Sequence, residues 1–135
     1  MNIEWLIPCR YLEVHDNLGT IVGAGIDTYW VPELPAPIQV LLAVRLLAME
    51  EELDPDQQHA VTNRVRNANG DVVNEVSGEF SVGAESARPE WLVGIIVPMV
   101  VQFEASEEGT YTIELEVDDA PPGSQPIHIV HGSPA

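Results

Sequence analysis

Alternation of apolar and polar residues is the clearest pattern in this chain. Between Thr110 and Val117, apolar side chains occupy every second position, and threonines and glutamates stand between them. A period of two is typical of a β-strand with one face in the core and one face in water. The pattern therefore predicts a half-buried strand at 110–117, with Tyr111 and Ile113 among its core-facing residues.

Turn residues predict two hairpins. Asn67-Ala-Asn69-Gly70 lies between the expected strands 57–66 and 71–80, and Asn-Gly tolerates the positive φ angles that tight hairpin turns require. A second hairpin is expected where the chain folds back across Asp16-Asn17-Leu18-Gly19, with the returning strand at 20–24.

The run Gln39–Met49 is apolar at every position except Gln39 and Arg45, as expected of a central strand covered on both faces. Its length also fits a helix, but the β-rich surroundings argue against one. We expect Arg45 to form an ion pair or to extend its charge to solvent at the edge of the core.

Prolines restrict two further segments. The segment Val31–Pro37 carries three prolines and is expected to be an extended crossing between two sheets, because proline suits neither a central strand nor a helix interior. Pro8 predicts an edge position or a bulge in a first strand within 3–15, for the same reason.

With further strands expected within 91–103 and at 127–130, the chain has about eight short strands separated by polar or Gly/Pro-rich segments. We therefore predict one all-β domain over residues 1–135, an antiparallel two-sheet β-sandwich of Greek-key, immunoglobulin-like type. A chain of 135 residues can bury a core without disulfides, and Cys9 is its only cysteine.

The charge is strongly negative. The chain has 22 Asp and Glu against five Arg and no Lys, which gives a net charge of −17. Such a surface repels phosphate groups, so we expect neither nucleic acid nor a membrane surface as a partner. The acidity is interpreted as a solubility feature. Without a secretory signal or an apolar run of ~20 residues, the expected location is the cytoplasm.

No combination of side chains forms a catalytic or nucleotide-binding motif, so no catalytic residue and no cofactor are predicted. Cys9 and His15 are ~20 Å apart along an extended strand, and Cys9 is interpreted as a small buried hydrophobe. His128 and His131 would point to opposite faces of a strand, which does not favour a metal site.

The only dense group of carboxylates is the expected polar loop Glu50–Asp56. It contains Pro55 and lacks the glycine that an EF-hand loop needs, so it is interpreted as a solvated charge run, and no metal ligand is assigned. A calcium-binding sandwich remains an alternative for this loop.

Aromatic residues and prolines make the segment from Tyr29 to Pro37 the candidate interaction surface, because rigid apolar side chains give contact area at low entropic cost. The alternative is that Tyr29 and Trp30 close one end of the sandwich. The residues of the candidate surface are Tyr29, Trp30, Val31, Pro32 and Leu34.

Several motifs resemble a family of small bacterial proteins known only as a domain of unknown function. They are the hairpin from Tyr11 to Asp27 with LEV and IVGAGID, the central VRLLA, the Asn-Gly-Asp hairpin and the closing EEGTYTIELEVDD. The resemblance covers most of the chain and implies a β-sandwich, but it implies no activity.

These observations favour a non-enzymatic binding or assembly module, with an unidentified protein or a second copy of the chain as the partner. Two alternatives stay open. One is a sandwich that binds calcium or carbohydrate through its loops, and the other is a small enzyme whose site is assembled from residues distant in sequence.

Overall fold

Strands make up most of the computed structural model, which describes residues 1–134. An all-β fold is therefore confirmed, although the strands exceed the number of about eight expected from the pattern. They are β1 (Asn2–Cys9), β2 (Tyr11–His15), β3 (Leu18–Val22), β4 (Thr28–Val31), β5 (Ala36–Ala48), β6 (His59–Arg66), β7 (Val72–Phe80), β8 (Val93–Ala105), β9 (Gly109–Val117) and β10 (Gly123–His131). One 3-10 helix, η1 (Glu50–Leu53), separates β5 from β6.

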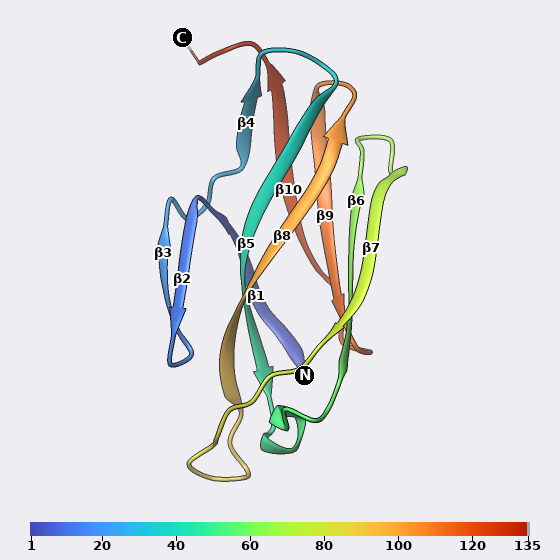
Figure 1. The fold of residues 1–135 in the computed structure, drawn as a ribbon. Helices are drawn as coiled ribbons and strands as arrows, with labels where there is room; N and C mark the ends of the chain where they lie inside the picture. The colour runs from blue at the N-terminus through green and yellow to red at the C-terminus, as the bar shows by residue number, and fades with distance from the viewer. Residues whose placement is uncertain (135) are drawn as a thin grey trace.

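The strands form three sheets (Figure 1). A three-stranded sheet has the order β1-β5-β8, a five-stranded sheet has the order β4-β10-β9-β6-β7, and β2 and β3 form a separate hairpin. All pairs are antiparallel except β4 with β10. The expectation of a wholly antiparallel arrangement is thus wrong at β4, because that strand reaches β10 from a distant part of the chain, with no hairpin turn to set its direction.

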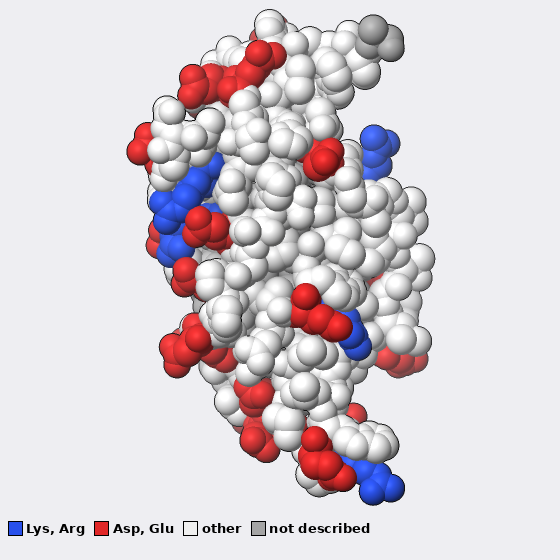
Figure 2. Space-filling model, turned by 180° about the vertical axis from the view of Figure 1, so that it is seen from behind, with Lys and Arg blue, Asp and Glu red and all other residues white. Residues whose placement is uncertain are grey.

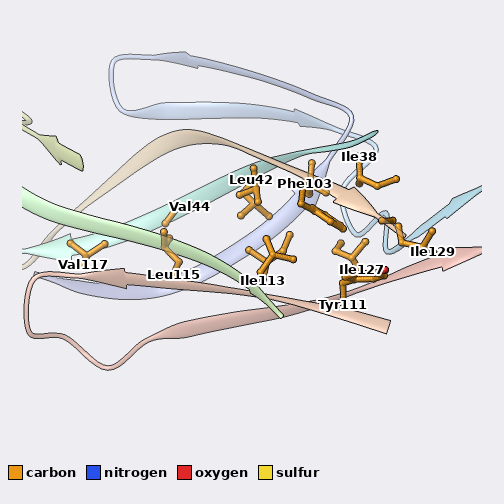
Figure 3. Close-up of a cluster of buried hydrophobic side chains, with 14 of the residues drawn as sticks. Ile38, Leu42, Val44, Phe103, Tyr111, Ile113, Leu115, Val117, Ile127 and Ile129 are labelled. Carbon is orange, nitrogen blue, oxygen red and sulfur yellow. The ribbon is translucent and has the colours of Figure 1, made fainter. Parts of the chain in front are cut away.

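The core lies between the two larger sheets (Figure 3). On β9, Tyr111, Ile113, Leu115 and Val117 are buried, so the predicted half-buried strand is confirmed. From the three-stranded sheet, alternate residues of β5 and β8 pack against them. The labelled examples in Figure 3 are Ile38, Leu42, Val44 and Phe103.

β5 is the central strand of the three-stranded sheet, as the apolar run predicted. The expectation that the proline segment lies outside any central strand is wrong for Pro37, which is part of β5. β1 pairs with β5 only as far as Leu41, so Pro37 has a strand neighbour on one side alone and no ladder bond there requires its missing N–H. Residues 32–35 do cross between the two sheets.

The 67–70 turn joins β6 to β7 as predicted, with Gly70 at φ +84°. In the first hairpin the predicted boundary is wrong. Asp16 and Asn17 alone make the turn, with φ of 51° and 61°, and Leu18 already begins β3. A two-residue turn with both residues left-handed matches the twist of a hairpin better than the longer turn we expected.

Two smaller expectations change and a third holds. β10 extends from Gly123 and lies inside the five-stranded sheet, so it is not a short closing strand at 127–130. The acidic loop begins with η1, whose Leu53 is buried in the core. Pro8 lies in β1, an edge strand, as expected, and the register shift of that strand lies between Ile3 and Trp5. In the described part of the chain, no helix is long and apolar enough to cross a membrane.

Candidate functional site

The outer face of the three-stranded sheet is largely apolar. Where β5 faces away from the core it presents Leu41 and Ala43, and the neighbouring positions on β1 and β8 include Ile7 and Ile96. The β2–β3 hairpin covers part of this face. A Cβ added at Gly19 would lie 3.0 Å from Ile96 Cδ1, so the hairpin backbone approaches the sheet closely there. An apolar outer sheet face needs such a cover.

Arg45 closes the end of this face near the start of β8. Its guanidinium pairs with Glu4, and it lies so close to Gly94 that a Cβ there would be 2.1 Å from Arg45 Nη2. The expected ion pair at the edge of the core is therefore confirmed.

The other end of the face is open. A groove of 630 Å³ lies over residues 37–39, 73–74 and 102–104, and a second groove of 380 Å³ lies over Cys9, Leu41 and Val100. Gln39 lines both, so the two grooves adjoin. We call them together the open trough. Arg10, Ile26 and Tyr29 complete the lining of the smaller groove.

The floor of the open trough combines apolar and amide groups. Val100 is 52% exposed, although it stands beside the half-buried Leu41. Gln102 Nε2 donates to Gln39 Oε1 at 3.1 Å, which links β8 to β5 across the trough. At the rim, the Asn74 side chain of β7 donates to the main-chain carbonyl of Gln102. The trough thus offers an apolar surface with donors and acceptors at one end.

Four ionisable side chains line the trough: the charged Arg10 and Glu104, and Cys9 and Tyr29, which are neutral. Burial raises the pKa of the Cys9 thiol, and burial is also the main cause that raises the pKa of Tyr29. His15 lies on the hairpin, largely exposed, and pairs with Glu13. Cys9 is buried, as the sequence predicted, and has no base beside it among the described contacts.

The structure separates the residues of the predicted interaction surface. Tyr29 is partly buried in the open trough, whereas Val31 belongs to the core. Trp30 is 46% exposed and points to the other side of β4, where a shallow hollow of 430 Å³ runs along 30–33 and 35–37. Pro32 is exposed and Leu34 is half-buried. Of the five residues, only Tyr29 reaches the open trough.

One constellation was missed from the sequence. His59 is 1% exposed, its Nδ1 lies 2.7 Å from Asp118 Oδ2, and its Nε2 lies 2.8 Å from the main-chain oxygen of Glu52. Asp118 Oδ1 also accepts a hydrogen bond from the Ala60 amide at 2.9 Å. His59 and Asp118 are distant in sequence, and only the pairing of β6 with β9 brings them together, so no local signal reveals them.

The hydrogen bonds fix the charge of His59. Both ring nitrogens face acceptors, so both carry protons. Burial alone would lower the pKa of His59, but the bonds to Asp118 and Glu52 outweigh it and raise the pKa above its ordinary value. Burial alone would raise the pKa of Asp118, but the hydrogen bonds from His59 and Ala60 outweigh burial and lower the pKa below its ordinary value. With both ring nitrogens held by acceptors, this pair fastens neighbouring segments of the chain together.

Metal ligands do not converge in residues 1–134, where no group of three His, Cys, Asp or Glu residues is placed to hold an ion. His128 Nδ1 lies 2.9 Å from Thr110 Oγ1, and His131 Nε2 lies 3.1 Å from the Pro32 carbonyl. In the acidic loop, the Glu52 and Asp54 carboxylates accept hydrogen bonds from the nearby amides of Met49 and Asp56.

The outer face of the five-stranded sheet is polar and internally paired. Arg64 contacts Glu75, Glu114 and Glu116, and Arg66 Nε donates to Glu114 at 2.6 Å. Figure 2 shows carboxylates spread along the whole length of the molecule on the side it displays, separated by uncharged surface. This distribution differs from the apolar open trough.

The comparisons with known proteins give a family and no activity. No curated protein matches the chain. A family model described as "Family of unknown function" (DUF6941) matches residues 4–130, almost the whole chain, and so confirms the resemblance to a domain of unknown function. The chain belongs to the DUF6941 family.

Proposed function

We propose that this protein is a non-enzymatic, cytoplasmic binding module whose two larger sheets form a Greek-key, immunoglobulin-like sandwich, and that the open trough binds another protein. The observation that carries the proposal is the uncovered end of the three-stranded sheet, where Val100 and Leu41 form an apolar floor beside the Gln39–Gln102 amide pair. An exposed apolar patch with polar groups at its rim is typical of a protein interface.

The ionisable groups support binding over chemistry. The Cys9 thiol is neutral because burial raises its pKa, and both nitrogens of His59 are occupied by acceptors. An enzyme needs a free base or an activated nucleophile within reach of the bound substrate. The other polar side chains of the trough are the amides of Gln39, Asn74 and Gln102 and the charged groups of Arg10 and Glu104, a mixture that suits recognition of a polypeptide.

Site-specific photo-crosslinking in the cells that make the protein tests the proposal. A benzophenone side chain is placed at Val100 in the trough or at Val22, which is equally exposed at 53% but lies on the outward face of the hairpin. We expect a discrete adduct with one other protein from Val100 and none from Val22.

A second variant shows whether the trough itself is needed. Gln39→Trp fills the position shared by both grooves and should abolish the adduct at Val100 while the melting temperature stays unchanged. Equal adducts from Val100 and Val22, no adduct at all, or an adduct that survives Gln39→Trp would each contradict the proposed function.

A further inference from the structure

The five-stranded sheet is wider than the three-stranded sheet that packs on it, and β7 is one of its two edge strands. In the register of β6 with β7, Val76 stands opposite Asn63, on the same side of the sheet as the buried Val65 and His59. Val76 therefore faces the core side, yet it is 52% exposed. Asn63 Oδ1 is buried there with no hydrogen-bond partner among the described residues. The sheet face is therefore covered at Asn63 but lacks a cover at Val76.

The neighbouring edge of β8 is unpaired. β8 pairs with β5 along its full length, and no strand of residues 1–134 pairs with its other edge, beside which β7 runs (Figure 1). The Gln102 carbonyl points to this free edge, since it accepts the bond from Asn74. Main-chain groups alternate in an antiparallel strand, so Val100 and Glu104 point the same way.

An extended segment fits this edge. Pro98, which has no N–H, occupies the same alternate position, and beyond it the edge presents the main-chain groups of Val100, Gln102 and Glu104, of which the Gln102 carbonyl already accepts a hydrogen bond from the Asn74 side chain. The larger groove of the open trough, 630 Å³, lies beside these residues and extends to Val73 and Asn74 of β7. A fourth strand placed here would also cover Val76.

The negative charge of the protein indicates which kind of segment would bind at the free edge of β8. Among the described residues, Glu104 has the only charged side chain in the lining of the larger groove. A second copy of this chain would bring another net charge of −17 to the same edge. A segment rich in Lys or Arg gains from the attraction and supplies donors to the acceptors at the edge.

We infer that the free edge of β8 binds an extended, basic segment of another protein, which adds to the three-stranded sheet as its fourth strand. This inference rests on the proposed function and specifies its binding mode and partner. Main-chain bonds to Val100, Gln102 and Glu104 hold the segment, its apolar side chains cover Val73 and Val76, and its basic side chains lie beside Glu104.

Amide hydrogen exchange with a defined peptide tests the inference. The probe is acetyl-KVKTKVKT-amide, and acetyl-KPKPKPKP-amide carries the same charges but cannot form a strand ladder. We expect the first peptide to bind at least about tenfold more tightly than the second, a difference of about 1.4 kcal/mol. It should slow exchange of the Val100, Gln102 and Glu104 amides in the wild-type protein.

Two charge variants test whether Glu104 attracts the basic peptide. Glu104→Lys should weaken binding of the first peptide about tenfold, whereas Glu51→Lys, an equal charge change at an exposed position on η1, should change it less than about twofold. Equal binding of both peptides, or protection at β4 instead of β8, would overturn the inference.

Two further outcomes separate the hypotheses. Protection of the β8 amides that rises with protein concentration and needs no peptide would show that a second copy covers the edge, and would overturn the basic partner. A Val100 adduct that Gln39→Trp abolishes, together with β8 amides that stay unprotected, would overturn strand addition and leave the proposed function standing.

Discussion

At the scale of single residues, the buried His59–Asp118 pair shows how the structure decides chemistry that residue types alone leave open. The carboxylate holds one ring nitrogen and the Glu52 carbonyl holds the other. The same two residue types form a catalytic pair elsewhere only when one nitrogen is free to accept a proton. Here the pair fastens the start of β6 to the end of β9 and to η1.

The raised pKa of His59 predicts a pH dependence of stability. A histidine whose folded-state pKa is raised stabilises the fold fully below its unfolded pKa of about 6.5, and this contribution is lost as the pH rises through the folded pKa. We therefore expect His59→Gln to cost about 2 kcal/mol near pH 6 and less as the pH rises. Urea denaturation at a series of pH values measures this difference.

His15→Gln is the matched control, because His15 is exposed on the hairpin. Its substitution should change the free energy of unfolding by less than about 0.5 kcal/mol at every pH. For Asp118 the pH dependence of stability has the opposite sign. Its lowered pKa gives stability above the ordinary value of about 3.9, and this is lost as the pH falls through the folded pKa. A cost of His59→Gln that does not vary between acid and alkaline pH would contradict the assignment.

At the scale of elements, the packing of β1 against β10 depends on a missing side chain. A Cβ on Gly123 would lie 2.5 Å from Leu6 Cδ2, so any other residue at this position would force the Leu6 side chain of β1 to move. The same strand meets β9 on its other side. Gly123 thus allows β10 to lie inside its sheet and against β1 at once.

Gly123→Ala should therefore destabilise the protein by about 1–3 kcal/mol through overpacking. Gly78→Ala in β7 is the control, because no atom lies within 4 Å of a Cβ added there. The control should be neutral or slightly stabilising, since alanine restricts the unfolded chain. Thermal denaturation of both variants compares them, and equal melting temperatures would show that Leu6 and Gly123 do not constrain each other.

At the scale of the whole molecule, the net charge of −17 should limit stability through self-repulsion. We expect the melting temperature to rise by roughly 4 °C, equivalent to about 1 kcal/mol, between about 20 mM and about 1 M NaCl. A triple variant with Glu51→Gln, Glu85→Gln and Glu90→Gln, all exposed positions, should respond less. A wild-type melting temperature that stays flat or falls with salt would refute self-repulsion as a limit on stability.

The sequence by itself determined the features that depend on near neighbours. Alternation placed the core face of β9, the Asn-Gly turn placed the β6–β7 hairpin, and the apolar run placed β5 at the centre of a sheet. Each of these follows from the two-residue period of a strand or from the dihedral angles that a turn residue tolerates. The repulsion of nucleic acid by the acidic surface is likewise an expectation that needs only composition.

Only the tertiary structure decided which strands are neighbours. The strand order places β4 parallel to β10, leaves Pro37 without a neighbour on one side and brings His59 to Asp118. Within residues 1–134 it also leaves the open trough beside an unpaired edge of β8. These features join residues that are far apart along the chain. Their partners are set by how two sheets of unequal width cover one core, and a local pattern of side chains carries no information about that.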